Sequence, residues 1–248
     1  MGTRIKLVLA YDGSEYCGWQ IQRGQPSIQE RTQSALSELT GESVALVASG
    51  RTDSGVHARA QVCHFDVEKA RIPSDRYWLA LNRLLPRDIR ALHSTEVHPD
   101  FHARFSALRR EYRYYLLDGR VAQPFQDRYV VADSRLPALP ILDSYARILP
   151  GIHDFSTFAA AGDPSNSPVR RIFAAGFYPQ GEYTVFRIVG NAFLWRMVRS
   201  LVGTMLELGR RRASEEEFRR ILQAGDRSSA GPTAPARGLF LHKVTYDE

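Results

Sequence analysis

The amino-acid sequence predicts an α+β fold of two split βαβ (ferredoxin-like) units, forming an extended, mostly antiparallel sheet with helices packed on it and a central cleft. First, strand-like and helix-like periodicities follow the order β-α-β-β-α-β over residues 4–97. Second, the same order recurs over residues 111–246, which indicates a duplicated unit. Third, the hydrophobic fraction of 44% is enough for a packed core. We therefore expect an N-terminal half over residues 1–105 and a C-terminal half over residues 106–248.

The first half opens with a strand in which apolar residues alternate on one face, followed by a well-delimited helix. Ser27 is placed to cap this helix, Glu30 completes a capping box three residues later, and Gly41 ends it. A helix starting at Ser74 is stopped by Pro86. In chain order, we expect a strand at 4–11, a helix at 27–40, strands at 44–48 and 61–66, a helix at 74–85 and a strand at 91–97.

The second half repeats this order with longer connections. A hairpin is expected around Gln180 and Gly181, and the longest helix of the chain follows it. Ser214, with Glu217 three residues later, predicts the start of a further short helix. In chain order, we expect a strand at 111–117, a helix at 140–149, the hairpin strands at 172–178 and 183–190, the long helix at 193–209, the short helix, and a last strand at 239–246. Two segments, 119–136 and 159–168, are expected to be long loops of the kind that carry function or lack order.

Composition narrows the class of protein. The net charge of +6 and the pI of about 9.5 favour a polyanionic partner. Nearly all basic residues are arginine, which suits bidentate phosphate contacts, although a codon bias explains the excess equally well. Two cysteines, Cys17 and Cys63, are too few for a disulfide framework. Without a signal-like or membrane-length apolar run, we expect a soluble, cytoplasmic protein.

The stretch from Ala48 to Ala58 connects two strand-like runs and is the candidate catalytic loop, because rigid strands can position the side chains of a loop between them. It contains one carboxylate, Asp53, and one guanidinium, Arg51, between Gly50 and Gly55. From the residues alone, an ordinary turn residue is the favoured interpretation of Asp53.

Read as a whole, the loop sequence Gly-Arg-Thr-Asp-Ser-Gly-Val-His at residues 50–57 resembles the active-site loop of the TruA family of tRNA pseudouridine synthases. Ser54 stands where alanine is more usual in that loop. Further segments resemble the family in the same order along the chain: Tyr11-Asp12-Gly13, Gly18-Trp19-Gln20, Ser27-Ile28-Gln29-Glu30, residues 101–107, Tyr112-Arg113-Tyr114, Asn191-Ala192-Phe193-Leu194, Met197-Val198-Arg199, and Pro235 with Gly238-Leu239. The segment 120–136 matches nothing in it.

The resemblance implies a homodimeric enzyme that converts uridines 38–40 of the tRNA anticodon stem-loop to pseudouridine without a cofactor. It implies that Asp53 is the essential carboxylate, acting as nucleophile or general base, with Arg51 and Arg199 as its partners. It places Tyr112 in the active site, where its ring can stack on the target uracil and its hydroxyl can help to move a proton. The candidate substrate-binding residues are Arg51, His57, Tyr112, Arg170 and Arg199.

Two other classes of protein remain as alternatives. A basic RNA-binding module without catalysis explains the charge and the aromatic residues but leaves the pairing of Arg51 with Asp53 without a purpose. A metal-dependent nuclease requires a cluster of carboxylates, whereas the loop supplies only Asp53. The histidines also argue against a structural metal site, since Pro99 interrupts the spacing of His98 and His102 and there is no Cys-x-x-Cys. We therefore expect no metal.

Overall fold

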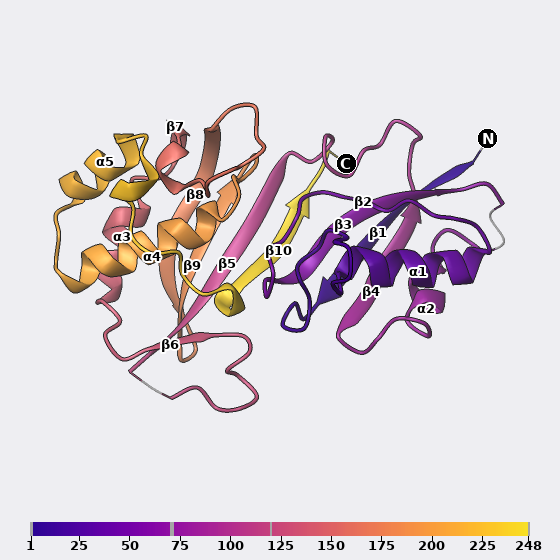
Figure 1. Ribbon diagram of the computed structural model, residues 1–248, viewed down its shortest axis with the longest axis horizontal. Helices are drawn as coiled ribbons and strands as arrows, with labels where there is room; N and C mark the ends of the chain where they lie inside the picture. Colours follow the sequence, from indigo (N-terminus) through magenta and orange to yellow (C-terminus); the bar gives the residue numbers. More distant parts are fainter. Residues whose placement is uncertain (1, 70–71, 120, 248) are drawn as a thin grey trace. The chain divides into compact units, whose positions relative to one another are not determined.

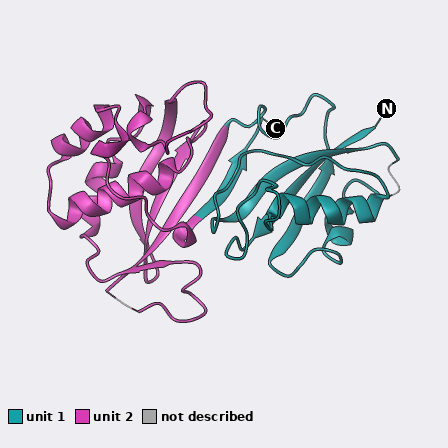
Figure 2. Cartoon of the chain, in the orientation of Figure 1, with its two compact units in different colours: residues 1–108, 240–248 teal, residues 109–239 magenta. Residues whose placement is uncertain are grey.

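The computed structural model describes residues 2–69, 72–119 and 121–247, so Arg120, the first residue of the segment without family resemblance, lies outside the described residues. The chain divides into two compact units (Figure 2). Unit 1 comprises residues 1–108 and 240–248, and unit 2 comprises residues 109–239. The two units differ from the expected domains at 1–105 and 106–248, because the end of the chain returns to unit 1.

Unit 1 contains a sheet in which β1 (Thr3–Tyr11) lies between β4 (Ile89–Glu96) and β3 (His57–Val67), with antiparallel pairing on both sides. The short β2 (Val47–Ala48) pairs antiparallel with β3, which gives the order β4-β1-β3-β2 of a split βαβ unit. The last strand, β10 (Leu239–Thr245), pairs in parallel with β3 through Phe240 opposite His57. The ribbon shows α1 (Ile28–Thr40) and α2 (Tyr77–Leu81) on one face of these strands (Figure 1).

The caps of α1 confirm the bounds that the sequence predicts. The Ser27 hydroxyl accepts a hydrogen bond from the Glu30 amide at 3.2 Å, which satisfies one of the free N–H groups of the first turn. At the other end Gly41 has a φ of 72°, and its amide bonds to the Ser37 carbonyl. A left-handed residue at this position is the usual way for a helix to end.

Two elements of unit 1 are shorter than the sequence predicts, because side chains bind the backbone instead. The α2 helix has only five residues. At its start, the Ser74 hydroxyl donates to the Glu96 carboxylate instead of capping the helix. At its end, the side-chain amide of Asn82 donates to the Ala91 carbonyl and accepts from the Ala91 N–H. The expected strand at 44–48 is reduced to β2. The amides of Val44 and Leu46 bond to side chains of α1, so they do not join the sheet.

Unit 2 contains a sheet with the order β5 (Arg109–Asp118), β9 (Tyr183–Gly190), β8 (Val169–Gln180) and β7 (Gly151–Asp154), all antiparallel. A further strand, β6 (Val131–Asp133), runs parallel to β5 inside the segment expected to be a loop. The predicted hairpin is confirmed, with Gly181 in the left-handed region at its turn. The three-residue helical turns η1, η2 and η3 cover Ser156–Phe158, Arg227–Ser229 and Ala236–Gly238.

The helices of unit 2 are α3 (Leu139–Ala146), α4 (Met197–Arg210) and α5 (Glu215–Gln223), and α3 packs against β8 and α4. Ser214 caps α5 as predicted. The α4 helix begins at Met197 rather than at 193, because Arg196 has a φ of 60° and interrupts the helical backbone. Among the described residues, no helix combines the length and the apolar character needed to cross a membrane.

Candidate active site

The candidate catalytic loop is residues 49–56, between β2 and β3 of unit 1. Exposure alternates along its centre: Arg51 is exposed, Thr52 is buried and Asp53 is half-buried. The expected pairing of Arg51 with Asp53 stays a prediction.

Thr52 attaches the centre of the loop to the core of unit 1. Its hydroxyl lies 2.8 Å from the hydroxyl of Tyr11, at the end of β1, and both groups are buried. Its carbonyl accepts a hydrogen bond from the Trp19 amide at 3.0 Å. A further bond from the Val56 amide to the Asp53 carbonyl, at 3.1 Å, closes a turn. These bonds hold the backbone on both sides of Asp53.

The start of the loop is fixed by the side chain of Gln61, on β3. Its carbonyl oxygen accepts from the Ser49 hydroxyl at 2.6 Å, and its amide donates to the Gly50 carbonyl at 2.9 Å. Gln61 is fully buried, so this pair of bonds also satisfies a polar side chain inside the core.

A second segment, residues 12–19, packs directly against the loop, and two glycines allow this close approach. A Cβ atom added to Gly18 would lie 2.5 Å from the Thr52 carbonyl oxygen, and Gly18 also has a φ of 91°. A Cβ atom added to Gly13 would lie 2.1 Å from the Val56 carbonyl oxygen. Neither distance is possible for real atoms, so these positions require glycine to keep the loop where it is.

Tyr16 connects this second segment to the far side of the loop. Its carbonyl accepts from the Ser54 hydroxyl at 3.2 Å and from the Gly55 amide at 3.3 Å. Its own hydroxyl donates to Asp88 at 2.9 Å. Burial, and then this hydrogen bond, raise the pKa of the Tyr16 phenol, which therefore remains a neutral donor.

His57 follows the loop as the first residue of β3 and is fully buried. Its ring stacks on that of Phe240 at a centroid distance of 4.6 Å. Its Nδ1 lies 3.1 Å from the Gly13 amide nitrogen and 3.1 Å from Asp12 Oδ1. These two contacts need different protonation states, because an unprotonated Nδ1 accepts from Gly13 and a protonated one donates to Asp12. Either way, the ring supports the loop from beneath.

The other predicted site residues belong to unit 2. Tyr112, on β5, is half-buried and meets the ring of Phe193 edge-on at 5.1 Å. Tyr114, two residues further on, is fully buried and donates to the Pro235 carbonyl at 2.8 Å. Burial raises the pKa of Tyr114, as expected for a phenol inside a core. Of the two tyrosines, Tyr112 is the one with exposed surface.

Arg199 lies in the first part of α4 and is half-buried. Its Nε donates to the Ala234 carbonyl at 2.8 Å, while the Ala234 amide donates to the Arg199 carbonyl at 3.0 Å. This reciprocal pair of bonds fixes the stem of the side chain to the segment before β10, which distinguishes Arg199 from a solvated arginine on a helix surface.

Arg170, on β8, is folded back onto its own strand. One terminal nitrogen donates to the carbonyls of Ser167 and Val169, and its buried Nε has no hydrogen-bond partner among the described residues. Burial lowers the pKa of the guanidinium, an effect that the nearby Asp163 carboxylate opposes. Arg170 is therefore engaged locally, unlike an arginine that extends into solvent.

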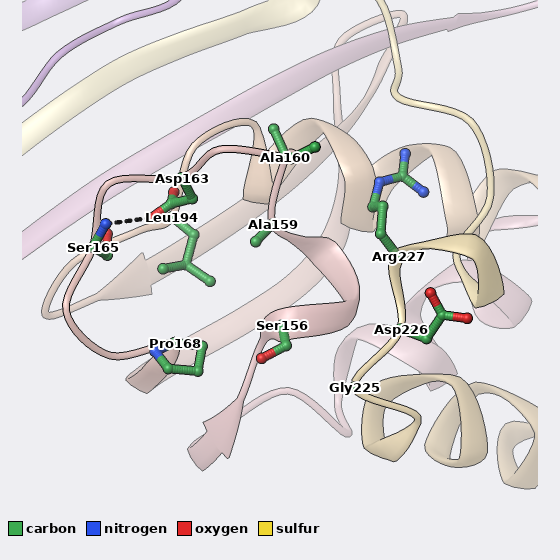
Figure 3. Close-up of a pocket in the computed structure, with 11 residues that line it drawn as sticks. Ser156, Ala159, Ala160, Asp163, Ser165, Pro168, Leu194, Gly225, Asp226 and Arg227 are labelled. Atoms are coloured by element: carbon green, nitrogen blue, oxygen red, sulfur yellow. Dashed lines mark hydrogen bonds between the residues drawn. The ribbon is translucent and has the colours of Figure 1, made fainter.

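The segment 159–168, expected to be a mobile or functional loop, is tied to the residues before α4. The Asp163 carboxylate accepts from the amides of Trp195 and Ser165, and Figure 3 shows the second of these bonds. Burial alone would raise the pKa of Asp163, but these hydrogen bonds lower it below its ordinary value. The segment lines a pocket of about 360 Å³, which none of the predicted site residues lines.

The structure thus gathers Arg51, Asp53 and His57 on and under one loop of unit 1, and places Tyr112, Arg170 and Arg199 in unit 2. Sequence reasoning did not identify the residues that hold the loop: Tyr11, Gly13, Tyr16, Gly18, Thr52 and Gln61. The signal was present, since four of these six lie in or between the motifs at 11–13 and 18–20. Among the described residues, no group of three His, Cys, Asp or Glu side chains is placed to hold a metal ion.

Comparison with known proteins agrees with the sequence motifs. A family model for tRNA pseudouridine synthase matches residues 7–106 and 145–247, which leaves the segment with Tyr112 unmatched. The chain is 46% identical to tRNA pseudouridine synthase A of Moorella thermoacetica, over 98% of this chain and 99% of that protein. It is 43% identical to the protein of the same name from Anoxybacillus flavithermus, with the same coverage. The corresponding protein of Treponema denticola is 41% identical over 98% of this chain and 93% of its own length.

Proposed function

This chain belongs to the tRNA pseudouridine synthase family, and we propose that it isomerises uridines 38–40 of the tRNA anticodon stem-loop with Asp53 as the essential carboxylate. It is an enzyme of the isomerase class, and tRNA is its substrate. The observation that supports the role of Asp53 best is the construction of its loop. Hydrogen bonds hold Thr52, Asp53 and Ser54 on both sides, although an ordinary surface turn needs no such support.

The reaction exchanges one bond between ribose and base for another. The N1–C1′ glycosidic bond breaks, the uracil turns while it remains bound, and a C5–C1′ bond forms. The proton on C5 leaves and N1 gains one, so atoms and electrons balance without an oxidant, a reductant or a cofactor. The chemistry therefore needs a carboxylate that acts as nucleophile or general base, and groups that retain the detached uracil. A half-buried carboxylate on a fixed loop suits the first requirement.

We assign the remaining predicted residues by their surroundings. Tyr112 stacks on the target base, since its ring keeps exposed surface and is braced by Phe193. Arg51 binds the substrate, because it is exposed and its bidentate fork suits a phosphate. Arg199 completes the catalytic set with Asp53. His57 acts on the substrate only by supporting the loop, and Arg170, folded onto its strand, shapes the binding surface around it.

We further propose that the enzyme is a homodimer that acts on tRNA in the cytoplasm. The proposal of a dimer rests on the resemblance to the family. Light scattering at micromolar concentration should give twice the mass of 28.0 kDa calculated for one chain. A fully active protein with the mass of one chain would contradict it.

The experiment that tests the function is tritium release from tRNA labelled at C5 of uridine, in excess chelator. Wild-type protein should release tritium, whereas Asp53→Asn should fold and bind tRNA with no detectable release. Asn serves as well as Asp in a turn, so a purely structural Asp53 would leave the mutant active. Release in chelator argues against a metal-dependent nuclease and a binding module without catalysis. Melting temperature and tRNA affinity, measured on the same preparation, show that the loss is chemical.

A further inference from the structure

Two arginines of unit 2 share the ring of one phenylalanine. The guanidinium carbon of Arg109 lies 4.6 Å from the centroid of the Phe173 ring, and that of Arg171 lies 5.4 Å from it. Both arginines are exposed, and the ring is half-buried between the sheet and solvent. Cation–π attraction therefore holds both cations next to the same ring.

The sheet brings these three residues together from separate strands. Arg109 begins β5, whereas Arg171 and Phe173 are on β8, and β9 lies between the two strands. A break in the β8–β9 register falls at Phe173, between Ile172 and Ala174. A bulge of this kind re-aims the side chain of the extra residue.

Asn191 then fixes the backbone of Arg171. Its side-chain oxygen accepts from the Arg171 amide at 3.0 Å, and its own amide donates to the Arg171 carbonyl at 3.0 Å. The carbonyl of Asn191 also accepts from Arg110, beside Arg109. The pair of guanidinium groups is thus held on a rigid part of the sheet.

Other arginines of unit 2 are engaged with carboxylates. Arg113 and Arg187 both pair with Glu111 at 2.8 Å, and Arg147 pairs with Asp143 at 2.8 Å. Further pairs join Arg210 to Asp133 and Arg211 to Glu217. In contrast, no salt bridge among the residues that the structure describes involves Arg109 or Arg171. Their two charges are therefore available to an external anion.

We propose that Arg109, Phe173 and Arg171 form a binding site for the phosphodiester backbone of tRNA. Phosphate oxygens accept strong, charge-assisted hydrogen bonds from guanidinium groups, so two arginines anchored on one ring can bind the backbone of an RNA chain. The ring orients the two planar groups and reduces the entropy that each loses on binding. The net charge of +6 favours a nucleic-acid backbone as the occupant. This inference rests on the proposed function for the identity of the RNA.

The test is tRNA binding as a function of salt concentration, from about 50 to 200 mM, for wild type, Arg109→Gln, Arg171→Gln and the double variant. Log affinity falls as log salt rises. Each single substitution should make this fall shallower by about 1 unit of slope, and the double variant by about 2. Arg147→Gln is the matched control, because it removes an exposed arginine that already has a carboxylate partner. Its slope should equal that of wild type.

Slopes of the three test variants that match wild type would overturn the proposal, as would an equal decrease in Arg147→Gln. Phe173→Leu gives an independent measurement, because it keeps both charges and removes the ring. It should weaken tRNA binding several-fold and leave the salt slope unchanged, and an unaltered affinity would contradict the role of the ring. Failure of the proposed function is distinguishable, since it would appear as the absence of tritium release by the wild-type protein whatever the salt slopes are.

Discussion

The hydroxyl groups of Tyr11 and Thr52 lie 2.8 Å apart inside unit 1, and they connect the end of β1 to the residue between Arg51 and Asp53. The centre of the candidate catalytic loop is therefore attached to the core by a side chain rather than by sheet hydrogen bonds. The position of the loop therefore depends on a residue outside it.

Tyr11→Phe should lower turnover by about tenfold or more, because a small displacement of a catalytic group is costly. The substitution removes one buried hydrogen bond, so the free energy of unfolding should fall by about 1 kcal/mol. Tyr145→Phe is the control, since the Tyr145 hydroxyl donates to the Ala213 carbonyl at 2.6 Å in unit 2. It should cost similar stability and leave turnover unchanged. If both variants turn over tRNA at the wild-type rate, the hydroxyl of Tyr11 does not position the loop.

Gly18→Ala should displace the loop, because the new Cβ atom would collide with the Thr52 carbonyl oxygen. Gly24→Ala provides a matched control, since Gly24 also has a positive φ but no atom lies within 4 Å of its Cβ position. Both variants should lose about 1–2 kcal/mol of stability from left-handed backbone strain. Only Gly18→Ala should show a further loss, in both melting temperature and tritium release. Equal effects in the two variants would mean that backbone strain, not contact with the loop, determines the result.

Tyr112→Phe should bind tRNA as wild type does, because the ring and its contact with Phe193 remain, but its turnover should fall. Tyr112→Ala should lose both capture of the target base and turnover, since it removes the stacking surface. Binding and single-turnover tritium release separate the two effects. A fully active Tyr112→Phe enzyme would show that the hydroxyl takes no part in proton transfer and that only the ring matters.

His64 should make the protein less stable in acid. Burial, then the charges of Arg4 and His102, lower the pKa of its imidazole from 6.5 to about 4, although Asp66 opposes this. Its Nδ1 accepts from the Ala103 amide at 3.1 Å, which requires an unprotonated nitrogen. The folded state disfavours the charged imidazole. The contribution of neutral His64 to the free energy of unfolding is therefore complete above pH 6.5 and decreases as the pH falls towards 4.

The check is chemical unfolding of wild type and His64→Asn between pH 7 and 4. Asn can accept the same hydrogen bond from Ala103 but does not titrate, so the variant should lose less stability than wild type over this range. Parallel stability curves for the two proteins would show that other groups, such as the carboxylates, account for all of the acid sensitivity.

Local signals in the sequence were sufficient for much of the secondary structure. Ser27, Glu30 and Gly41 determine the ends of α1, because capping depends on residues within one turn of the chain. The β8–β9 hairpin was equally predictable from the glycine at its turn. In two elements of unit 1 the prediction was wrong because a distant partner competed for the same backbone. The α2 helix ends early because Asn82 binds β4, and the strand before the catalytic loop shortens because side chains of α1 bind its amides.

The sequence by itself determined the family, the duplicated α+β plan and the loop that carries Asp53, because each of these is a pattern of residues along the chain. Only the tertiary structure decided which residues hold that loop and which arginines are available to RNA. Gly18 is required because of an atom 34 residues away in Thr52, and Arg109, unlike Arg147, forms no salt bridge among the described residues. Such roles depend on distances between residues far apart in sequence, which composition and spacing do not contain.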